Sequence, residues 1–299
     1  MIRYRALTKT FGVQRAVADL TLDVGRGEVL ALLGPNGSGK TTTLKAAAGL
    51  IRPTSGEVLL GEPGLPASAP EARRAISYLP QRVSFPDALT GQEVVEFYRA
   101  LRGVRAGRTH DVLHFASLNG AGNRNVGTYS GGMVQRLGLA VAMLAEAPIL
   151  LLDEPTAALD PDGLVAFYDL VDRRKHEDGT VFFTSHQLGD AERLADRFAI
   201  LVEGKLVAVL SQAELHDRLS ERGVMRLKLG SVPPTLHARV SALVPDADWQ
   251  DQDLVIPGAA ASRPAIIEVV RAAGVEILGL TTEEGRLDSF YRELVGEQQ

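Results

Sequence analysis

A glycine-rich segment carries the strongest chemical signal in the sequence. Gly34-Pro35-Asn36-Gly37-Ser38-Gly39-Lys40-Thr41 matches the phosphate-binding pattern G-x-x-x-x-G-K-[ST] in full. Glycines let backbone N–H groups curl around phosphate oxygens, and the N-terminus of a following helix adds a positive dipole end. We therefore expect Lys40 to reach the β and γ phosphates of a nucleotide, the Thr41 hydroxyl to ligate Mg²⁺, and Thr42 to belong to the same site.

Two adjacent carboxylates, Asp153 and Glu154, form the second chemical element. They end the apolar run Ile149–Leu152, and Asp153 lies 113 residues after Lys40. Side chains alternate along a strand, so the two carboxylates point differently. Asp153 suits the Mg²⁺ shell, and Glu154 suits a base that polarises an attacking water.

A third segment, Tyr129-Ser130-Gly131-Gly132-Met133, lies before these carboxylates, with Ser130 23 residues ahead of Asp153. It resembles the LSGGQ signature of the ATP-binding-cassette (ABC) ATPases, with Tyr for Leu and Met for Gln. The family's other motifs occur in order around it: Phe11 in TKTFG for the aromatic at adenine, Gln81 in YLPQ for the Q-loop, Asp160 in Ala158-Leu159-Asp160 for the D-loop, and His186 in TSH for the switch histidine. The resemblance covers about residues 2–215. Tyr4 competes with Phe11 for the role of the adenine aromatic.

This resemblance implies the roles of the matched residues. Glu154, His186 and Gln81 are expected to act in catalysis, and Thr41, Gln81 and Asp153 to hold Mg²⁺. The residues expected to bind ATP are Phe11, the segment from Gly34 to Thr42, Ser130, Gly131, Gly132 and Asp160. The departures at Tyr129 and Met133 should be tolerated, because the serine and both glycines that face phosphate are kept.

The resemblance also implies partners. ABC ATPases work as head-to-tail pairs. Each ATP lies between the Walker motifs of one subunit, which here are the glycine-rich segment and the strand that ends in Asp153 and Glu154, and the signature of the other subunit. One motif set therefore predicts pairing with a second copy of the chain, and Gln81 is expected to report the phosphate state to an integral membrane permease docked near residues 82–100. We expect no nucleic-acid partner.

Transport is favoured over the alternatives. About 90 residues separate Lys40 from Ser130, which leaves no room for the long coiled coil of chromosome-maintenance ATPases. A soluble ABC ATPase acting on nucleic acid or the ribosome is the alternative; a non-hydrolysing regulatory cassette is disfavoured by Glu154 and His186. The YSGGM signature and the acidic tail are similar to those of the ATPase of the copper-processing, nitrous-oxide-reductase maturation transporter. Exporter ATPases for drugs, ions or polysaccharide share much of the pattern.

Composition and hydropathy limit the possibilities further. The 299-residue chain has no cysteine and a formal net charge of −5, which excludes thiolate chemistry and a binder that relies on bulk positive charge. The longest apolar run, Leu137–Ala145, is far shorter than the ~20 residues of a spanning helix, and the N-terminus lacks the apolar core of a signal peptide. We expect a cytoplasmic chain, peripheral on the inner face of the cell membrane.

Apolar runs predict an α/β chain of two domains. Helix starts are expected at Thr90, which forms a capping box with Glu93, and at Asp160, a cap followed by Pro161. The resemblance implies a P-loop NTPase core in residues 1–220: a mainly parallel sheet flanked by helices, an antiparallel β subdomain, and an inserted helical subdomain at about 83–147. Residues 221–299 carry 8 Lys/Arg and 12 Asp/Glu and predict a small α+β accessory domain. Expected strands are 28–33, 57–60, 76–79, 148–153, 180–185, 198–202, 224–230, 252–256 and 275–281, and expected tail helices are 235–243, 263–273 and 286–295.

Overall fold

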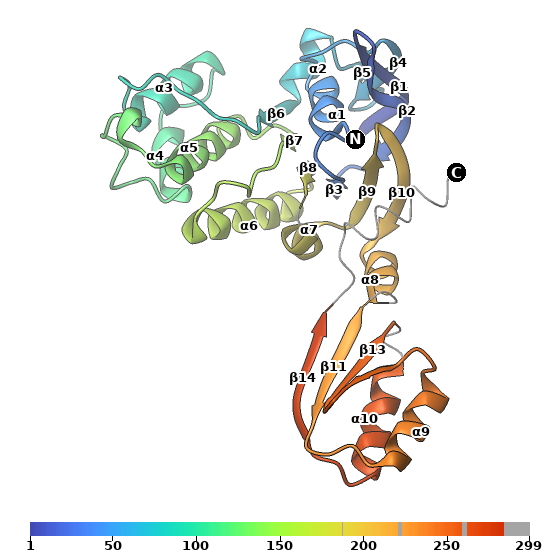
Figure 1. Ribbon diagram of the computed structural model, residues 1–299. Coiled ribbons are helices and arrows are strands. Elements are labelled where there is room, and N and C mark those ends of the chain that lie inside the picture. Colours follow the sequence, from blue (N-terminus) through green and yellow to red (C-terminus); the bar gives the residue numbers. More distant parts are fainter. Residues whose placement is uncertain (187, 221–222, 259–261, 284–299) are drawn as a thin grey trace. The chain divides into compact units, whose positions relative to one another are not determined.

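A six-stranded sheet forms the centre of the first part of the chain in this computed structural model (Figure 1). Its order is β10-β9-β3-β8-β7-β6; β10 is antiparallel to β9, and the other neighbours are parallel. Every residue of β3, β7 and β8 is buried, as the uninterrupted apolar runs of β3 and β7 predict. The strands are β3 (Val29–Leu33), β6 (Ile76–Leu79), β7 (Ile149–Leu152), β8 (Thr180–Ser185), β9 (Arg197–Val202) and β10 (Lys205–Ser211).

The structure describes all residues except 187, 221–222, 259–261 and 284–299. The chain divides into two compact units, Met1–Ser211 and Gln212–Gln299. The sequence placed this boundary after residue 220, so helix α8 (Gln212–Ser220) falls in the second unit instead of the first. Among the described residues, no helix has the length and apolar character needed to cross a membrane.

A second, antiparallel sheet in the first unit has the order β2-β1-β4-β5. Its strands are β1 (Ile2–Phe11), β2 (Gln14–Val24), β4 (Ser55–Leu60) and β5 (Leu65–Pro66). Only β4 was located from the sequence. Ala6 and Asp19 adopt positive φ, and the β1–β2 register shifts along the pair, so the alternation that reveals a half-buried strand is interrupted. The mixed α/β class with antiparallel strands is confirmed.

The segment between β6 and β7 is helical. Thr90 begins α3 with the expected capping box: its Oγ1 accepts from Glu93 N at 3.2 Å, and Glu93 Oε2 accepts from Thr90 N at 2.8 Å. The helices of this segment are α3 (Gly91–Leu101), α4 (Arg108–Phe115), the 3-10 turn Val126–Thr128 and α5 (Gly131–Met143). The other helices of the first unit are α1 (Lys40–Ala47), α2 (Pro70–Arg74), α6 (Pro161–His176) and α7 (Leu188–Leu194).

The second unit has an antiparallel sheet of its own, in the order β12-β13-β11-β14. Its helices and strands contribute buried apolar side chains, among them Leu227, Val240 and Ile266, to a separate core. The elements are β11 (Val224–Leu229), α9 (Pro234–Leu243), β12 (Asp248–Gln250), β13 (Asp253–Pro257), α10 (Arg263–Ala272) and β14 (Ile277–Glu283). The sequence located all of these within two residues except β12, which is three residues long; the expected helix 286–295 lies outside the described residues.

Candidate functional site

The glycine-rich loop joins β3 to α1 and holds a buried lysine. Gly39 has φ +103°, and a Cβ there would lie 2.3 Å from the carbonyl oxygen of Ala16, so this position requires glycine. Lys40 is 5% exposed, and its Nζ donates to the carbonyl oxygens of Gly34 at 2.8 Å and Pro35 at 3.1 Å. Burial lowers the pKa of Lys40, while the nearby Glu154 carboxylate acts in the opposite direction.

Asp153 lies at the carboxyl end of β7 and is fully buried. Its Oδ1 accepts from Thr41 Oγ1 at 3.1 Å and from Thr184 Oγ1 at 2.8 Å. Burial raises the pKa of Asp153, although these two hydrogen bonds oppose the rise. Asp153 Oδ2 and Ser38 Oγ are buried without a hydrogen-bond partner. Such atoms are costly to bury unless a ligand satisfies them, and a cation with phosphate oxygens is the matching chemistry.

Glu154 is the point at which three distant parts of the chain meet. Gln81 Nε2 donates to its Oε2 at 2.9 Å, His186 Nδ1 lies 3.4 Å from the same oxygen, and Lys40 Nζ lies 3.8 Å from Oε1. The Glu154 side chain is only 9% exposed, and its backbone φ is +47°. A non-glycine residue in this conformation costs of order 1–3 kcal/mol, and such strain clusters at functional sites.

Thr184 is a site residue that the sequence analysis missed. Its hydroxyl donates to Asp153 Oδ1 and accepts from the backbone N–H of Glu154 at 2.8 Å. One hydroxyl therefore holds both the carboxylate of Asp153 and the backbone of Glu154. The available signal was a polar residue inside the apolar strand TVFFTS, two positions before His186.

The signature segment and the D-loop form a second cluster. Ser130 caps α5, where its Oγ accepts from Met133 N at 3.2 Å. A Cβ on Gly132 would lie 3.3 Å from the carbonyl oxygen of Ala158 and 3.5 Å from Asp160 Cγ, so this glycine lets the two segments approach closely. Among the residues that the structure describes, no hydrogen bond or ion pair joins Ser130 or Asp160 to the side chain of Glu154.

The local structure accommodates the tyrosine that replaces leucine at the first position of the signature. Tyr129 donates its hydroxyl to the carbonyl oxygen of Ala121 at 2.7 Å. The ring lies against the first turn of α3, where a Cβ on Gly91 would come within 2.2 Å of the hydroxyl oxygen. Tyr129 is therefore accommodated away from Ser130 by a glycine on a neighbouring helix.

Phe11, the expected adenine aromatic, ends strand β1 and is 51% exposed, with Lys9 Nζ 4.9 Å from its ring centroid. The competing aromatic, Tyr4, is fully buried and donates its hydroxyl to the carbonyl oxygen of Thr43. Of the two, only Phe11 presents a ring surface to a ligand.

Comparison with known proteins gives this geometry its context. Residues 17–157 match the family described as "ABC transporter". The uncharacterized ABC transporter ATP-binding protein YxlF of Bacillus subtilis is 41% identical over 212 residues, which are 69% of each chain. The chain belongs to the ABC transporter ATP-binding proteins. It is therefore an ATPase subunit, and its family binds and hydrolyses nucleotide.

Other relatives of this ABC ATPase extend over nearly its whole length. The bacitracin transport ATP-binding protein BcrA of Bacillus licheniformis is 30% identical over 99% of this chain and 97% of its own. Among solved structures, the dimeric bacterial ABC transporter cassette MJ0796 is 29% identical, with a TM-score of 0.65, over 71% of this chain and 99% of that one. The relationship to BcrA therefore includes the second unit.

Proposed function

We propose that the chain binds ATP between its own phosphate loop and the signature segment of a second copy, and that this pairing energises a separate integral membrane permease. The observation that carries the proposal is the division of the motifs into two clusters. Lys40 of the phosphate loop lies beside Glu154 together with Gln81 and His186. The signature residue Gly132, by contrast, approaches Ala158 and Asp160 of the D-loop. A related cassette that was solved as a dimer supports the pairing of two copies.

The residues present fit Mg²⁺ together with ATP. Asp153 Oδ2 and Ser38 Oγ are buried polar atoms without partners, and hard oxygen ligands are those that Mg²⁺ prefers. Thr41, Asp153 and Gln81 would hold the ion, which supplies positive charge against the phosphate oxygens. Within this arrangement Lys40 binds the phosphates, and the Glu154 carboxylate, oriented by Gln81 and His186, accepts the proton of the attacking water.

A groove beside the helical segment suits the permease. A cavity of about 350 Å³ is lined by side chains from the end of β6, the segment after it, α3 and α5, including Tyr78, Arg82, Phe85 and Tyr98. It adjoins Gln81 in sequence and falls within the expected region near 82–100. On α3 itself, Phe97 is 60% exposed and Leu101 is 71% exposed. Docking here, on the inner face of the membrane, would couple the state of the bound phosphates to the conformation of the permease.

The decisive experiment for the pairing uses Glu154→Gln, which keeps the shape of the side chain but removes the base. We expect this variant to run as a monomer in gel filtration without nucleotide or with ADP, and as a dimer with ATP and Mg²⁺. The γ-phosphate is the only difference between the two nucleotides. Persistence of the monomer with saturating ATP, in a folded variant, would refute the sandwich.

For the cargo, we infer export of a drug-like or peptide antibiotic. Relatives that align over 97–99% of the chain are named for bacitracin transport, linearmycin resistance and daunorubicin resistance. The alternative is the copper-processing transporter that the signature and tail resemble, although a chain with no cysteine and four methionines offers little to a soft metal.

The two cargoes are separated by ATPase assays of the complex reconstituted with its membrane subunit. We expect an amphiphilic antibiotic to raise turnover by several-fold above the basal rate of the complex, because transport substrates act through the permease. Copper ions at matched ionic strength should leave the rate unchanged. Stimulation by copper alone would contradict the inference and favour the copper-processing alternative.

A further inference from the structure

Arg136 connects the signature helix to the D-loop. It lies on α5, six residues after Ser130, with a side chain only 10% exposed. Its Nη2 donates to Asp160 Oδ2 at 3.2 Å, and its Nη1 donates to the carbonyl oxygen of Ser117 at 3.3 Å. Its Nε is buried without a partner among the described residues, so these two hydrogen bonds compensate the buried charge and fix the position of the guanidinium.

The two carboxylate oxygens of Asp160 accept hydrogen bonds from different parts of the chain. Oδ1 caps α6 by accepting from Gly163 N at 3.0 Å, while Oδ2 receives the Arg136 guanidinium. A Cβ on Gly163 would lie 3.2 Å from Arg136 Cδ, so the stem of the arginine packs against the first turn of α6. Together with the close approach of Gly132 to Ala158, this ties the signature to the D-loop at two points.

We propose that Arg136 is a positioning residue that makes the signature segment and the D-loop one rigid surface for the ATP held by the second copy. The inference rests on the proposed pairing. The signature belongs to the helical segment, whereas the D-loop precedes α6. If the two moved independently, association would have to restrict that motion, which weakens binding. A charge-assisted hydrogen bond from the buried Arg136 to the partly exposed Asp160 removes this freedom before the partner arrives.

Three variants separate this role from general packing. Arg136→Met keeps an unbranched stem and removes every donor, and Arg136→Lys keeps the charge with a single donor group. Asp160→Asn retains an oxygen for capping α6 but replaces the other acceptor by an amide group that cannot accept from Arg136.

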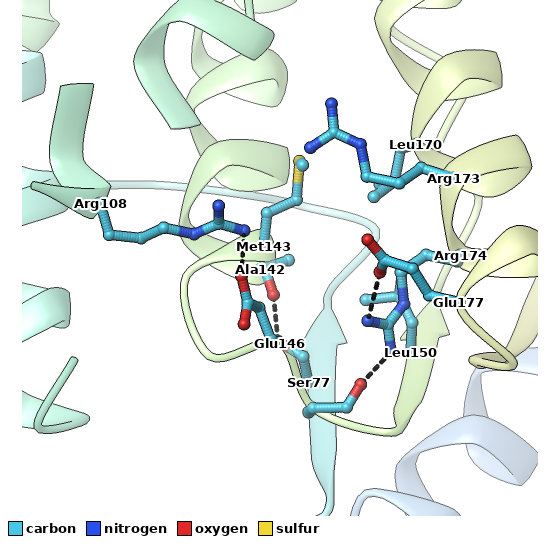
Figure 2. A pocket seen from close by; sticks show the side chains of 11 residues that line it. Ser77, Arg108, Ala142, Met143, Glu146, Leu150, Leu170, Arg173, Arg174 and Glu177 are labelled. Atoms are coloured by element: carbon cyan, nitrogen blue, oxygen red, sulfur yellow. Dashed lines mark hydrogen bonds and ion pairs between the residues drawn. The ribbon is translucent and has the colours of Figure 1, made fainter. Parts of the chain in front are cut away.

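The matched control is Arg108→Met. Arg108 also lies in the helical segment, is 16% exposed, and pairs with Glu146 at 2.9 Å. Figure 2 shows this pair lining a cavity together with Met143, at the other end of α5, and Arg174 of α6. The control removes a comparable ion pair without touching the D-loop.

The experiment measures ATP-dependent dimerisation in the Glu154→Gln background by sedimentation, with ATP affinity and thermal melting of the dilute monomer measured in parallel. Loss of a charged hydrogen bond predicts about a tenfold rise in the dimer dissociation constant for Arg136→Met. Arg136→Lys should recover part of this loss. Asp160→Asn should match Arg136→Met, and the double variant should add nothing further. For Arg136→Met and Arg136→Lys, the affinity of the monomer's own phosphate loop for ATP should stay within about twofold of the parent.

Unchanged dimerisation of Arg136→Met or of Asp160→Asn would overturn the proposal. An equal loss of dimerisation in Arg108→Met would also overturn it. So would a fall in the ATP affinity and melting temperature of the monomer that parallels the loss of dimerisation, since either result indicates a general role in stability. If the Glu154→Gln parent itself fails to dimerise with ATP, the proposed pairing fails and this inference fails with it. If the parent dimerises with ATP and Arg136→Met dimerises equally well, this inference fails and the proposed pairing stands.

Discussion

Lys40→Ala is expected to abolish measurable nucleotide binding. The Lys40 amine is buried beside two carbonyl oxygens of the phosphate loop and 3.8 Å from Glu154, where it supplies a positive charge within the loop. Removing one partner of a buried charge pair typically costs about 3–5 kcal/mol. At about 1.4 kcal/mol per factor of ten, the nucleotide affinity should fall by roughly two to three orders of magnitude or more.

The measurement is a titration with a fluorescent ATP analogue and competition by unlabelled ATP. Lys45→Ala is the matched control, because Lys45 lies on the same helix and carries the same charge but stands in its last turn. We expect Lys45→Ala to bind nearly as the parent does. If Lys40→Ala retained parental affinity and turnover, the phosphates would have to lie elsewhere.

Glu154→Gln is expected to lower ATP turnover by ~10²-fold or more, because the amide cannot accept the proton of the attacking water. Nucleotide binding should survive, since the substitution preserves the volume and most of the hydrogen bonding beside Gln81 and His186. Phosphate release over several hours measures the residual rate, and the binding titration is run on the same preparation.

Glu28→Gln provides the control for this experiment. Glu28 directly precedes β3, at the opposite end of the strand from the phosphate loop, and pairs with Arg197 at 2.9 Å. The same chemical change there should alter turnover by no more than about threefold, because no reacting group lies nearby. Turnover of Glu154→Gln within that same range would exclude Glu154 as the base.

The sequence predicted the central strands well, because burial on both faces gives β3 and β7 uninterrupted apolar runs and gives β8 an apolar centre at Val181–Phe183. It missed β1 and β2, where backbone irregularities at Ala6 and Asp19 break the alternation, and β10, an edge strand with mostly half-buried side chains. The capping patterns at Thr90 and Asp160 were predicted correctly, since a cap depends on residues only three positions apart. The boundary between the units lies between residues 211 and 212 and not after 220, because tertiary contacts assign α8 to the second unit, whereas the change in composition occurs later in the chain.

The sequence by itself determined the phosphate loop, the adjacent carboxylates, the signature and the family resemblance, because each is a local pattern whose geometry follows from neighbouring residues. Only the tertiary structure decided which of these meet. Gln81, Glu154 and His186 converge because β6, β7 and β8 are successive neighbours in the sheet, and Thr184 and Arg136 acquired roles through contacts 24 to 31 residues away in the chain. Strand order and helix packing set such contacts, because burial of the whole core, and not any local spacing, fixes them.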